Sequence, residues 1–447
     1  MTNPSQSAGS SQSAGSSQIA GSSQIAGVDA WQVLDSRGRP TVRARVQLAD
    51  GTSGTATAPS GASTGTHEVH ELRDGGVAWG GRGVVRAVSQ VKDVIGPAIR
   101  GADSADQQAV DAIIAQLDGP TMSTIGGNAA IAVSLAVSMA HASSLGIELW
   151  QVWTKDPLLP MPMVNIVSGG AHAGRLLDIQ DVLVVPVGAS SIEEALSWCA
   201  AVREASASIA ASRGLPASLV ADEGGIAGAM GSNRAGIELV LDGINAAGLN
   251  PGDDMAIALD IAATQFMGED GRYHLSLDRR DLSAHQWVDE VADWVRDLYV
   301  VSVEDPLAED DWSGWSYASQ ELAGIQLLGD DLFVTSQERL RRGIDQGIAS
   351  SVLVKVNQCG TVSGARRVVE LAQQHGYTSV VSARSGETEE SWLADLAVGW
   401  RAGQIKVGST TRSERTAKWN RLLDIAHANP SAQLAPWPFP VQGQPRP

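Results

Sequence analysis

Short apolar runs alternate with amphipathic stretches from Met161 onward. Each run is rich in β-branched residues, ends at a polar or charged residue, and is followed by a stretch of helical length and periodicity. The runs are MVNIVSG, DVLVVPVG, SLVADEGG, MAIALDIA, VVSVEDP, IQLLGDDL, SVLVKVNQ, TSVVSARSG and QIKVGST. The later run ends recur about every 25 residues, a spacing that fits one strand, one helix and two loops. The pattern predicts an α/β fold with a closed β/α (TIM) barrel, whose strand ends form the functional face.

A doubly wound parallel sheet is the competing architecture for the same pattern. Such sheets commonly carry a GxGxxG or GxxxxGK[ST] motif after a strand. Neither motif follows any strand-like run in this chain. The barrel is therefore the preferred prediction.

The segment before the barrel has a different pattern. Apolar residues alternate with polar ones at Val42, Ala44, Val46 and Leu48, as in a half-buried strand. Residues 25–153 are predicted to form a separate α+β domain with a strand-rich start and a helical second half. Residues 154–428 are predicted to form the barrel.

Both ends of the chain have biased composition. Residues 1–24 repeat a Ser/Gly-rich hexapeptide, which we expect to form a disordered tail because it cannot bury enough apolar surface; a partner-binding tail is the alternative. Residues 429–447 are Pro-rich and are expected to be an unpacked tail.

The charge and the apolar runs limit the classes of partner. A formal net charge of −18 opposes nonspecific attraction to nucleic acid and to anionic lipid, so an anionic small substrate needs a local cationic pocket. The most apolar segment, residues 128–144, contains Ser and His and is predicted to be a buried helix rather than a membrane span. Two cysteines and no secretory signal pattern indicate a reducing cytoplasm.

Three acidic residues end neighbouring runs, and a barrel would bring them together. Asp260, Glu304 and Asp330 have no cation among them in sequence, and bare like charges would repel. A hard divalent cation with oxygen ligands, Mg²⁺, neutralises such a set. The alternative is that each residue caps the following helix.

Two lysines and two further carboxylates are expected at the same mouth. Lys355 and Lys406 end later runs, and a lysine near other cations loses its proton more easily, which favours a general base at neutral pH. A structural salt bridge is the alternative. Glu223 and Asp181 also end apolar segments, and two close carboxylates raise the pKa of one of them, which suits proton donation.

Long blocks of the chain resemble the signature blocks of enolases and occur in the same order over about residues 25–425. These blocks are PSGASTGTHEVHELRDGG, SGGAHAG, ADEGG, IALDIAATQF, VEDPLAEDDW, LLGDDLFVT, LVKVNQCGT, SARSGETEE and IKVGSTTRSERTAKWNRLL. The resemblance implies an N-terminal α+β capping domain and a modified (β/α)8 barrel that opens ββαα. It also implies a homodimer or an oligomer of dimers.

The resemblance implies two Mg²⁺ ions in each active site and a small phosphorylated or phosphonylated substrate. The matching ligands of the first ion are Asp260, Glu304 and Asp330. Ser63, in the loop that closes on the site, matches a ligand of the second ion and a substrate contact. Lys355 matches the base that removes the proton α to the substrate carboxylate, and Lys406 holds that carboxylate.

The remaining matches surround the leaving group and the phosphoryl group. Glu223 matches the acid that helps the β-hydroxyl to leave, and His172 matches a histidine of another closing loop. Arg384 and Ser385 match the phosphate-binding pair.

Several positions depart from the enolase pattern. Ala383 stands where enolases have a substrate-contacting histidine, which removes a donor and adds space. Asp181 and Gln265 each replace a Glu, and IAGAM follows DEGG in place of FAPN. None of these changes removes a proposed metal ligand or the base.

The departures favour a specialised paralogue. Its substrate would be larger than 2-phosphoglycerate or different at phosphorus, as for a relative whose product resembles phosphoenolpyruvate with a carboxyl group added on phosphorus. An ordinary phosphopyruvate hydratase and a non-catalytic binding protein on the same scaffold are the alternatives.

Overall fold

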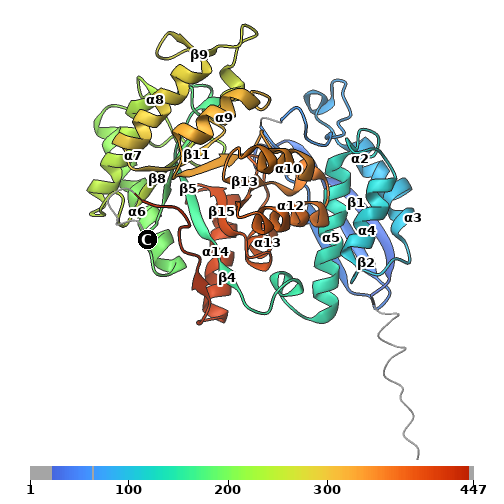
Figure 1. Cartoon of the computed structure of the whole chain (residues 1–447). Coiled ribbons are helices and arrows are strands. Elements are labelled where there is room, and N and C mark those ends of the chain that lie inside the picture. The colour runs from blue at the N-terminus through green and yellow to red at the C-terminus, as the bar shows by residue number, and fades with distance from the viewer. Residues whose placement is uncertain (1–22, 63–64, 442–447) are drawn as a thin grey trace, which may run out of the picture.

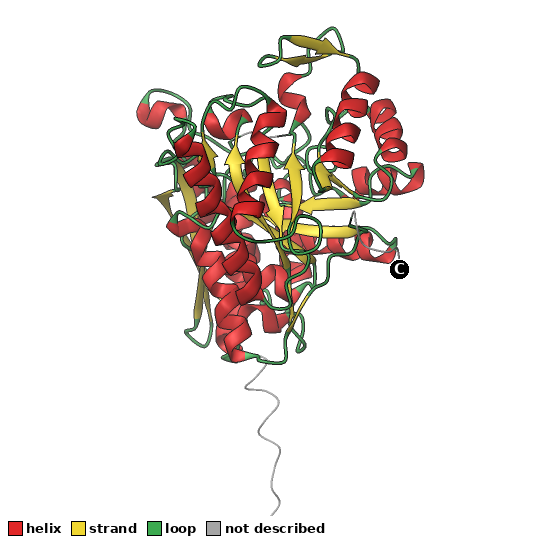
Figure 2. Cartoon of the chain, turned by 90° about the vertical axis from the view of Figure 1, so that its left-hand side faces the viewer, coloured by secondary structure: helices red, strands yellow, loops and turns green. Residues whose placement is uncertain are grey.

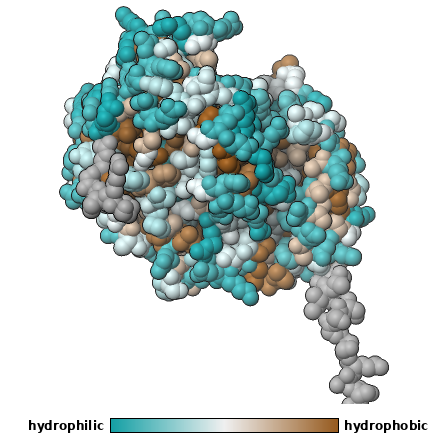
Figure 3. Space-filling model, viewed as in Figure 1, coloured by the Kyte–Doolittle hydropathy of each residue, from teal (hydrophilic) through white to brown (hydrophobic). Residues whose placement is uncertain are grey.

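The computed structural model describes residues 23–62 and 65–441. The predicted hexapeptide tail lies almost entirely outside the described residues. Figure 1 shows a smaller N-terminal region, coloured blue to teal, beside a larger region coloured green to red. The face shown in Figure 3 is mostly hydrophilic, with hydrophobic residues in scattered patches.

The N-terminal region is an antiparallel sheet packed on helices. The strands β1 (Ile25–Leu34), β2 (Pro40–Leu48) and β3 (Ser53–Thr57) lie in that order. The alternation predicted for β2 is confirmed, because Val42, Ala44, Val46 and Leu48 are all buried. The helical elements are η1 (Ala78–Gly81), α2 (Val85–Gln90), η2 (Val91–Ile95), α3 (Gly96–Ile99), α4 (Gln107–Gln116), α5 (Gly127–Leu145) and η3 (Leu149–Val152).

Helix α5 is the apolar centre of this region. Among the described residues it is the one helix long and apolar enough, by length and composition alone, to cross a membrane, yet 72% of its apolar window is buried inside the structure. The strand β3 approaches it closely at Gly54, where a Cβ atom would lie 2.1 Å from the backbone nitrogen of Ala140. The prediction of a buried core helix is therefore confirmed.

Eight strands of the described residues close into the predicted barrel. They are β5 (Met161–Ser168), β6 (Asp181–Val185), β8 (Ala256–Asp260), β11 (Val300–Glu304), β12 (Gln326–Gly329), β13 (Ser351–Val354), β14 (Thr378–Ser382) and β15 (Gly403–Gly408). The strand β6 is antiparallel to both of its neighbours, and β15 pairs with β5 to close the sheet. The order β5, β6, α6, α7 confirms the expected ββαα opening.

Helices enclose the barrel strands (Figure 2). They are α6 (Ile192–Ser212), α7 (Asn233–Ala246), α8 (Ala284–Asp297), α9 (Trp312–Glu321), α10 (Gln337–Gln346), α11 (Val356–Cys359), α12 (Val362–Gln374), α13 (Trp392–Gly399) and α14 (Ser413–Ala428). Side chains of Ser191, Ser232, Ser283, Ser336 and Thr361 cap five of them by accepting backbone N–H bonds. The short elements are β4 (Leu158–Leu159), η4 (Gly170–Ala173), β7 (Ile226–Ala227), η5 (Ala263–Phe266), β9 (Tyr273–Leu275), β10 (Arg280–Leu282) and β16 (Gln433–Leu434).

A separate apolar cluster lies beneath the strand ends. It contains Ala258, Leu328 and Leu353, each two positions before an acidic or basic residue at a strand end. Because side chains two apart on a strand share a face, this layer supports the site above it.

Two expectations for the fold are wrong. The run at 218–225 is not a barrel strand; its end is a charged, glycine-containing loop, and Gly225 approaches β5 so closely that a Cβ would lie 2.5 Å from Ser168 Oγ. The Pro-rich end was expected to be unpacked, but it packs against the barrel up to residue 441. Its strand β16 pairs with β4, and Val441 is buried against the barrel cluster.

Candidate active site

The strand ends bring the predicted charged residues together. Asp260 and Glu304 are the last residues of β8 and β11, and Asp330 follows β12 directly. Lys355 follows β13, and Lys406 lies on β15. The three carboxylates and Lys406 are buried, so their charges are balanced mainly by one another.

Lysines lie among the carboxylates. Lys406 Nζ donates hydrogen bonds of 2.6 Å to both Asp260 Oδ2 and Glu304 Oε2. Lys355 Nζ donates to Asp330 Oδ2. In the sequence the three acids have no cation among them. In the structure each acid contacts a lysine, so the expectation of three bare charges is incomplete.

Burial and like charge act on Glu304. Burial and the neighbouring Asp260 raise its pKa well above the usual value, although Lys406 opposes them. Its Oε1 atom is buried and has no hydrogen-bond partner among the described residues. An unpartnered carboxylate oxygen of this kind suits a hard divalent cation.

Lys355 differs from the expectation. Burial is the strongest single effect and lowers its pKa, but the carboxylates of Asp330 and Glu304 raise it, and the net pKa lies above the usual value. Arg384 and Lys406 act in the predicted direction without prevailing. In this arrangement Lys355 is an ammonium group, not a free base.

The tightest groups of metal-binding atoms differ from the predicted trio. Within the described part of the chain, ligand atoms lie within 4.8 Å of one another in the group Asp305, Asp330 and Asp331 and in the group His172, Asp181 and Glu223. The carboxylate of Asp305 accepts the backbone N–H groups of Asp330 and Asp331 at 3.0 and 2.7 Å. Asp305 therefore orients the turn that carries Asp330.

His172 lies between the two carboxylates that were expected to contact each other. Its Nδ1 is 2.8 Å from Asp181 Oδ2, and its Nε2 is 3.7 Å from Glu223 Oε1. Ser168 Oγ donates to the other Asp181 oxygen at 2.7 Å. The imidazole bridges the gap that the shorter Asp181 side chain leaves.

As predicted, the pKa of one of the two carboxylates is raised, but this carboxylate is Asp181 and not Glu223, the residue matched to the acid. Burial raises the pKa of Asp181. Burial also acts to raise the pKa of Glu223, but the surrounding cations, His172 first among them, together lower it below the usual value. Burial acts to lower the pKa of His172, but the negative charges of Asp181 and Glu223 raise it, and the net pKa is about 9. The proton at neutral pH is therefore on His172, not on Glu223.

Arg384 and Ser385 follow β14 at the same mouth, as predicted. The Arg384 guanidinium pairs with Glu68, and Ser385 Oγ accepts the backbone N–H of Ala62 at 2.8 Å. Ser63 lies outside the described residues. Glu68 was missed because no local pattern links it to Arg384.

Arg415 was also missed. It is fully buried, and it donates to the backbone carbonyls of Arg384 and Ser385 at 2.7 and 2.6 Å. Its helix α14 thereby holds the segment after β14 in place. The sequence shows an arginine in the block RSER, but its burial and its contacts are visible only in the structure.

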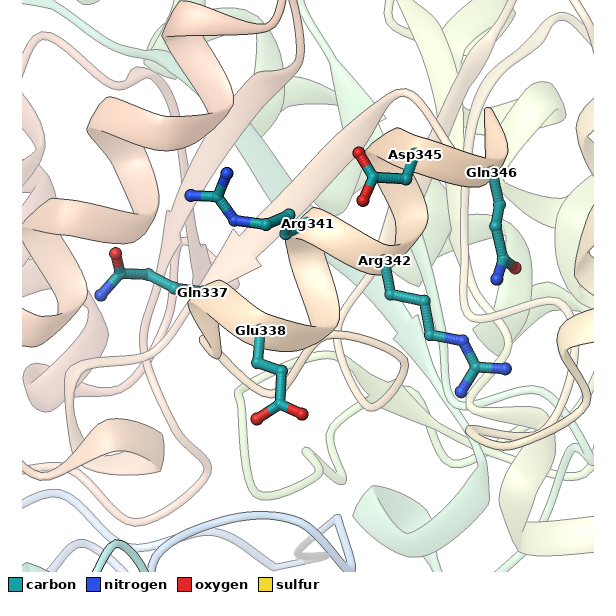
Figure 4. A pocket seen from close by; sticks show the side chains of 6 residues that line it. All are labelled: Gln337, Glu338, Arg341, Arg342, Asp345 and Gln346. Atoms are coloured by element: carbon teal, nitrogen blue, oxygen red, sulfur yellow. The ribbon is translucent and has the colours of Figure 1, made fainter.

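The described side chains leave a cavity of about 20 Å³ at the mouth, enough for about one water molecule. Its lining includes His172, Gln180, Lys355, Ala383 and Arg384. A second, open hollow of about 580 Å³ lies along α10. Figure 4 shows that the exposed side chains of that hollow extend from the helix in several directions without converging on one point, so they form no comparable site.

The chain matches two family models in the order that the fold suggests. Residues 25–153 match the enolase N-terminal domain, and residues 156–434 match the enolase C-terminal TIM barrel domain. Together the two matches cover nearly all of the described residues. The chain therefore belongs to the enolase superfamily.

Proposed function

We propose that this protein is an Mg²⁺-dependent lyase that removes the proton α to a carboxylate. Its substrate would be 2-phosphoglycerate or a close analogue, and its product an enolpyruvyl phosphate or phosphonate. The observation that carries the proposal is the meeting of two lysines and three carboxylates that lie on, or directly after, five barrel strands. A proton α to a carboxylate is weakly acidic, so its removal needs fixed positive charge near the developing negative charge.

Asp260, Glu304 and Asp330 would hold one Mg²⁺ ion, and Ser63 would contribute to a second. All four offer oxygen atoms, and Glu304 Oε1 is a buried acceptor without a partner in the described residues. When bound, the ions supply positive charge at the substrate carboxylate.

Lys355 would take the proton, and Lys406 would donate hydrogen bonds to the substrate carboxylate. Both nitrogens now bond to protein carboxylates, so substrate binding must redirect them. Lys355 must also lose its own proton before it can accept another. Because Lys355 would take the proton, exchange of the α-hydrogen with solvent depends on this residue.

His172, Asp181 and Glu223 would act on the leaving β-hydroxyl. The hydroxyl departs as water after it accepts a proton, and His172 is the member of this group that carries a proton at neutral pH. Asp181 orients the imidazole through Nδ1.

Arg384 and Ser385 would bind the phosphorus-centred group, with Ala383 beside them. Alanine leaves space where an imidazole would lie, which favours a substrate with a larger group on phosphorus. We therefore favour a carboxyphosphonoenolpyruvate synthase of phosphonate or phosphinate antibiotic biosynthesis. Ordinary phosphopyruvate hydratase is the alternative, and the presence of all five charged residues disfavours a non-catalytic binding protein.

The test incubates the purified protein with Mg²⁺ and 2-phosphoglycerate in deuterated water, with and without the cytidylyl ester of phosphonoformate. We expect deuterium to enter the α position in the wild type and in Lys92→Ala, a control at an exposed lysine. Lys355→Ala should abolish the exchange. Undiminished exchange in Lys355→Ala would overturn the mechanism, and rapid formation of phosphoenolpyruvate from 2-phosphoglycerate alone would overturn the paralogue assignment.

A further inference from the structure

A chain of side-chain amides connects the loop that carries His172 to the proposed metal ligand Asp260. The backbone N–H of Ala171 donates to Gln265 Oε1 at 3.0 Å. Gln265 Nε2 donates to Gln180 Oε1 at 2.6 Å, and Gln180 Nε2 donates to Asp260 Oδ2 at 3.0 Å. Three hydrogen bonds in series therefore join the two sides of the site.

The direction of this chain is fixed at both ends. A backbone N–H can only donate, so Gln265 must turn its carbonyl oxygen toward Ala171. An ionised carboxylate can only accept, so Gln180 must turn its NH₂ group toward Asp260. A neutral amide at position 265 can accept at one end and donate at the other, whereas an ionised carboxylate can only accept.

Close packing keeps the amides in register. Gly170 has a φ of +43°, and a Cβ atom there would lie 3.0 Å from Gln180 Cα and 3.3 Å from Gln265 Oε1. Gln180 is buried, and its backbone N–H also donates to the Asp260 carbonyl oxygen at 2.9 Å. The loop, Gln265 and Gln180 therefore form one packed unit against the end of β8.

We propose that Gln265 is a positioning residue that transmits the placement of the His172 loop to Asp260 through Gln180. This inference rests on the proposed function, because it assigns the relay to the orientation of a metal ligand. Gln180 and Lys406 both donate to Oδ2 of Asp260, so the bond from Gln180 helps to orient the carboxylate with Oδ1 toward the cation. Groups that hydrogen-bond to metal ligands commonly change metal affinity by about 10–100-fold.

Two substitutions separate the relay from a simple charge effect. In Gln265→Glu, the carboxylate can still accept from Ala171 but cannot donate to Gln180. In Gln265→Met, both bonds are lost without adding charge. The relay predicts weaker Mg²⁺ binding in both variants, by about tenfold, whereas a charge effect alone predicts tighter binding in Gln265→Glu and no change in Gln265→Met.

The measurements are Mg²⁺ titration calorimetry on the full chain and hydrogen exchange of the Ala171 amide in the metal-free protein. We expect the amide to stay protected in Gln265→Glu and to exchange faster in Gln265→Met. Gln373→Glu, at an exposed amide on α12 that contacts the carbonyls of Trp400 and Arg401, is the control and should behave as the wild type.

The outcomes distinguish the relay from the proposed function. Wild-type Mg²⁺ affinity in both variants would overturn the relay alone, as would tighter binding in Gln265→Glu. Failure of the wild type to bind Mg²⁺ would overturn the proposed function and, with it, the relay.

Discussion

The guanidinium of Arg384 donates to both carboxylate oxygens of Glu68, with Nη1–Oε2 at 2.9 Å and Nη2–Oε1 at 3.3 Å. The side chains are only 3% and 6% exposed, so this is a buried ion pair. The backbone N–H of Gly65 also donates to Glu68, at 2.9 Å. An anionic substrate group that binds Arg384 must therefore compete with an internal carboxylate.

Glu68→Gln is expected to bind inorganic phosphate about tenfold more tightly than the wild type, because it removes the competing charge at Arg384. It is also expected to lower the free energy of unfolding by about 3 kcal/mol in the absence of anions, since one partner of a buried pair is lost. Urea unfolding with and without phosphate measures both effects. Glu238→Gln, in an exposed pair with Arg234, should cost less than about 1 kcal/mol. Unchanged phosphate affinity in Glu68→Gln would show that Glu68 does not compete.

The titration of His172 gives a stability signal with a definite sign. Its pKa of about 9 lies above the value of about 6.5 in the unfolded chain. A raised pKa means that the contribution to stability is fully present below pH 6.5 and is lost as the pH rises through about 9. The contribution is about 3 kcal/mol.

NMR titration of the imidazole nitrogens in protein treated with EDTA checks this prediction. His141 serves as the internal contrast, because burial lowers its pKa. His172→Asn should flatten the dependence of stability on pH between 6.5 and 9. Titration of His172 at or below pH 6.5 would contradict the bridge to Asp181 and Glu223.

Much of the scaffold could be predicted because its signals are local. The period of two at Val42 to Leu48 predicts a buried strand face, and the repeat of apolar runs predicts the barrel. The positions of Asp260 and Glu304 at strand ends could also be predicted, because each directly follows an apolar run. The run at 218–225 was wrongly predicted to be a barrel strand. Its apolar start resembles a strand, but its charged, glycine-containing end forms a loop outside the sheet.

The contacts inside the site could not be predicted, because they depend on distances between strands. Lys406 bonds to Asp260, which lies 146 positions earlier, and this pairing fixes which charges are neutralised. The pKa of Glu223 falls because His172 happens to lie 3.7 Å away. The sequence indicates which groups lie at the barrel mouth. Which of them are protonated depends on which side chains are neighbours there, and this is visible only in the structure.

Ala383→His tests whether space beside Arg384 sets the choice of substrate. Ala383 is buried and lines the cavity of about 20 Å³, so an imidazole there would occupy volume and add a donor. We expect activity toward the substrate with the larger phosphorus group to fall about 10²-fold, because the imidazole would displace that group from its productive position. Activity toward 2-phosphoglycerate should rise.

The measurement is kcat/KM for each substrate. Ala383→Leu is the matched control, because it fills the space without adding a donor and should lower the first activity without raising the second. An unchanged ratio of the two activities in Ala383→His would show that the space beside Arg384 does not set the choice of substrate.

Trp287 ties helix α8 to the segment that follows Glu304. The indole is fully buried, and its Nε1 donates to the carbonyl oxygen of Pro306 at 2.8 Å. Its ring also contacts Phe266 and Trp294 edge to face, with centroids 5.8 and 5.3 Å apart.

Trp287→Ala is expected to lower the free energy of unfolding by about 3–5 kcal/mol, because it leaves a cavity and an unpaired carbonyl. Urea unfolding followed by far-ultraviolet circular dichroism measures the loss without relying on tryptophan emission. Trp79→Ala, at a side chain that is 53% exposed, should change the free energy by no more than about 0.5 kcal/mol. Since Pro306 lies two positions after Glu304, Trp287→Ala should also weaken Mg²⁺ binding, whereas Trp79→Ala should not. Equal losses of stability in the two variants would show that burial at α8 does not support this side of the barrel mouth.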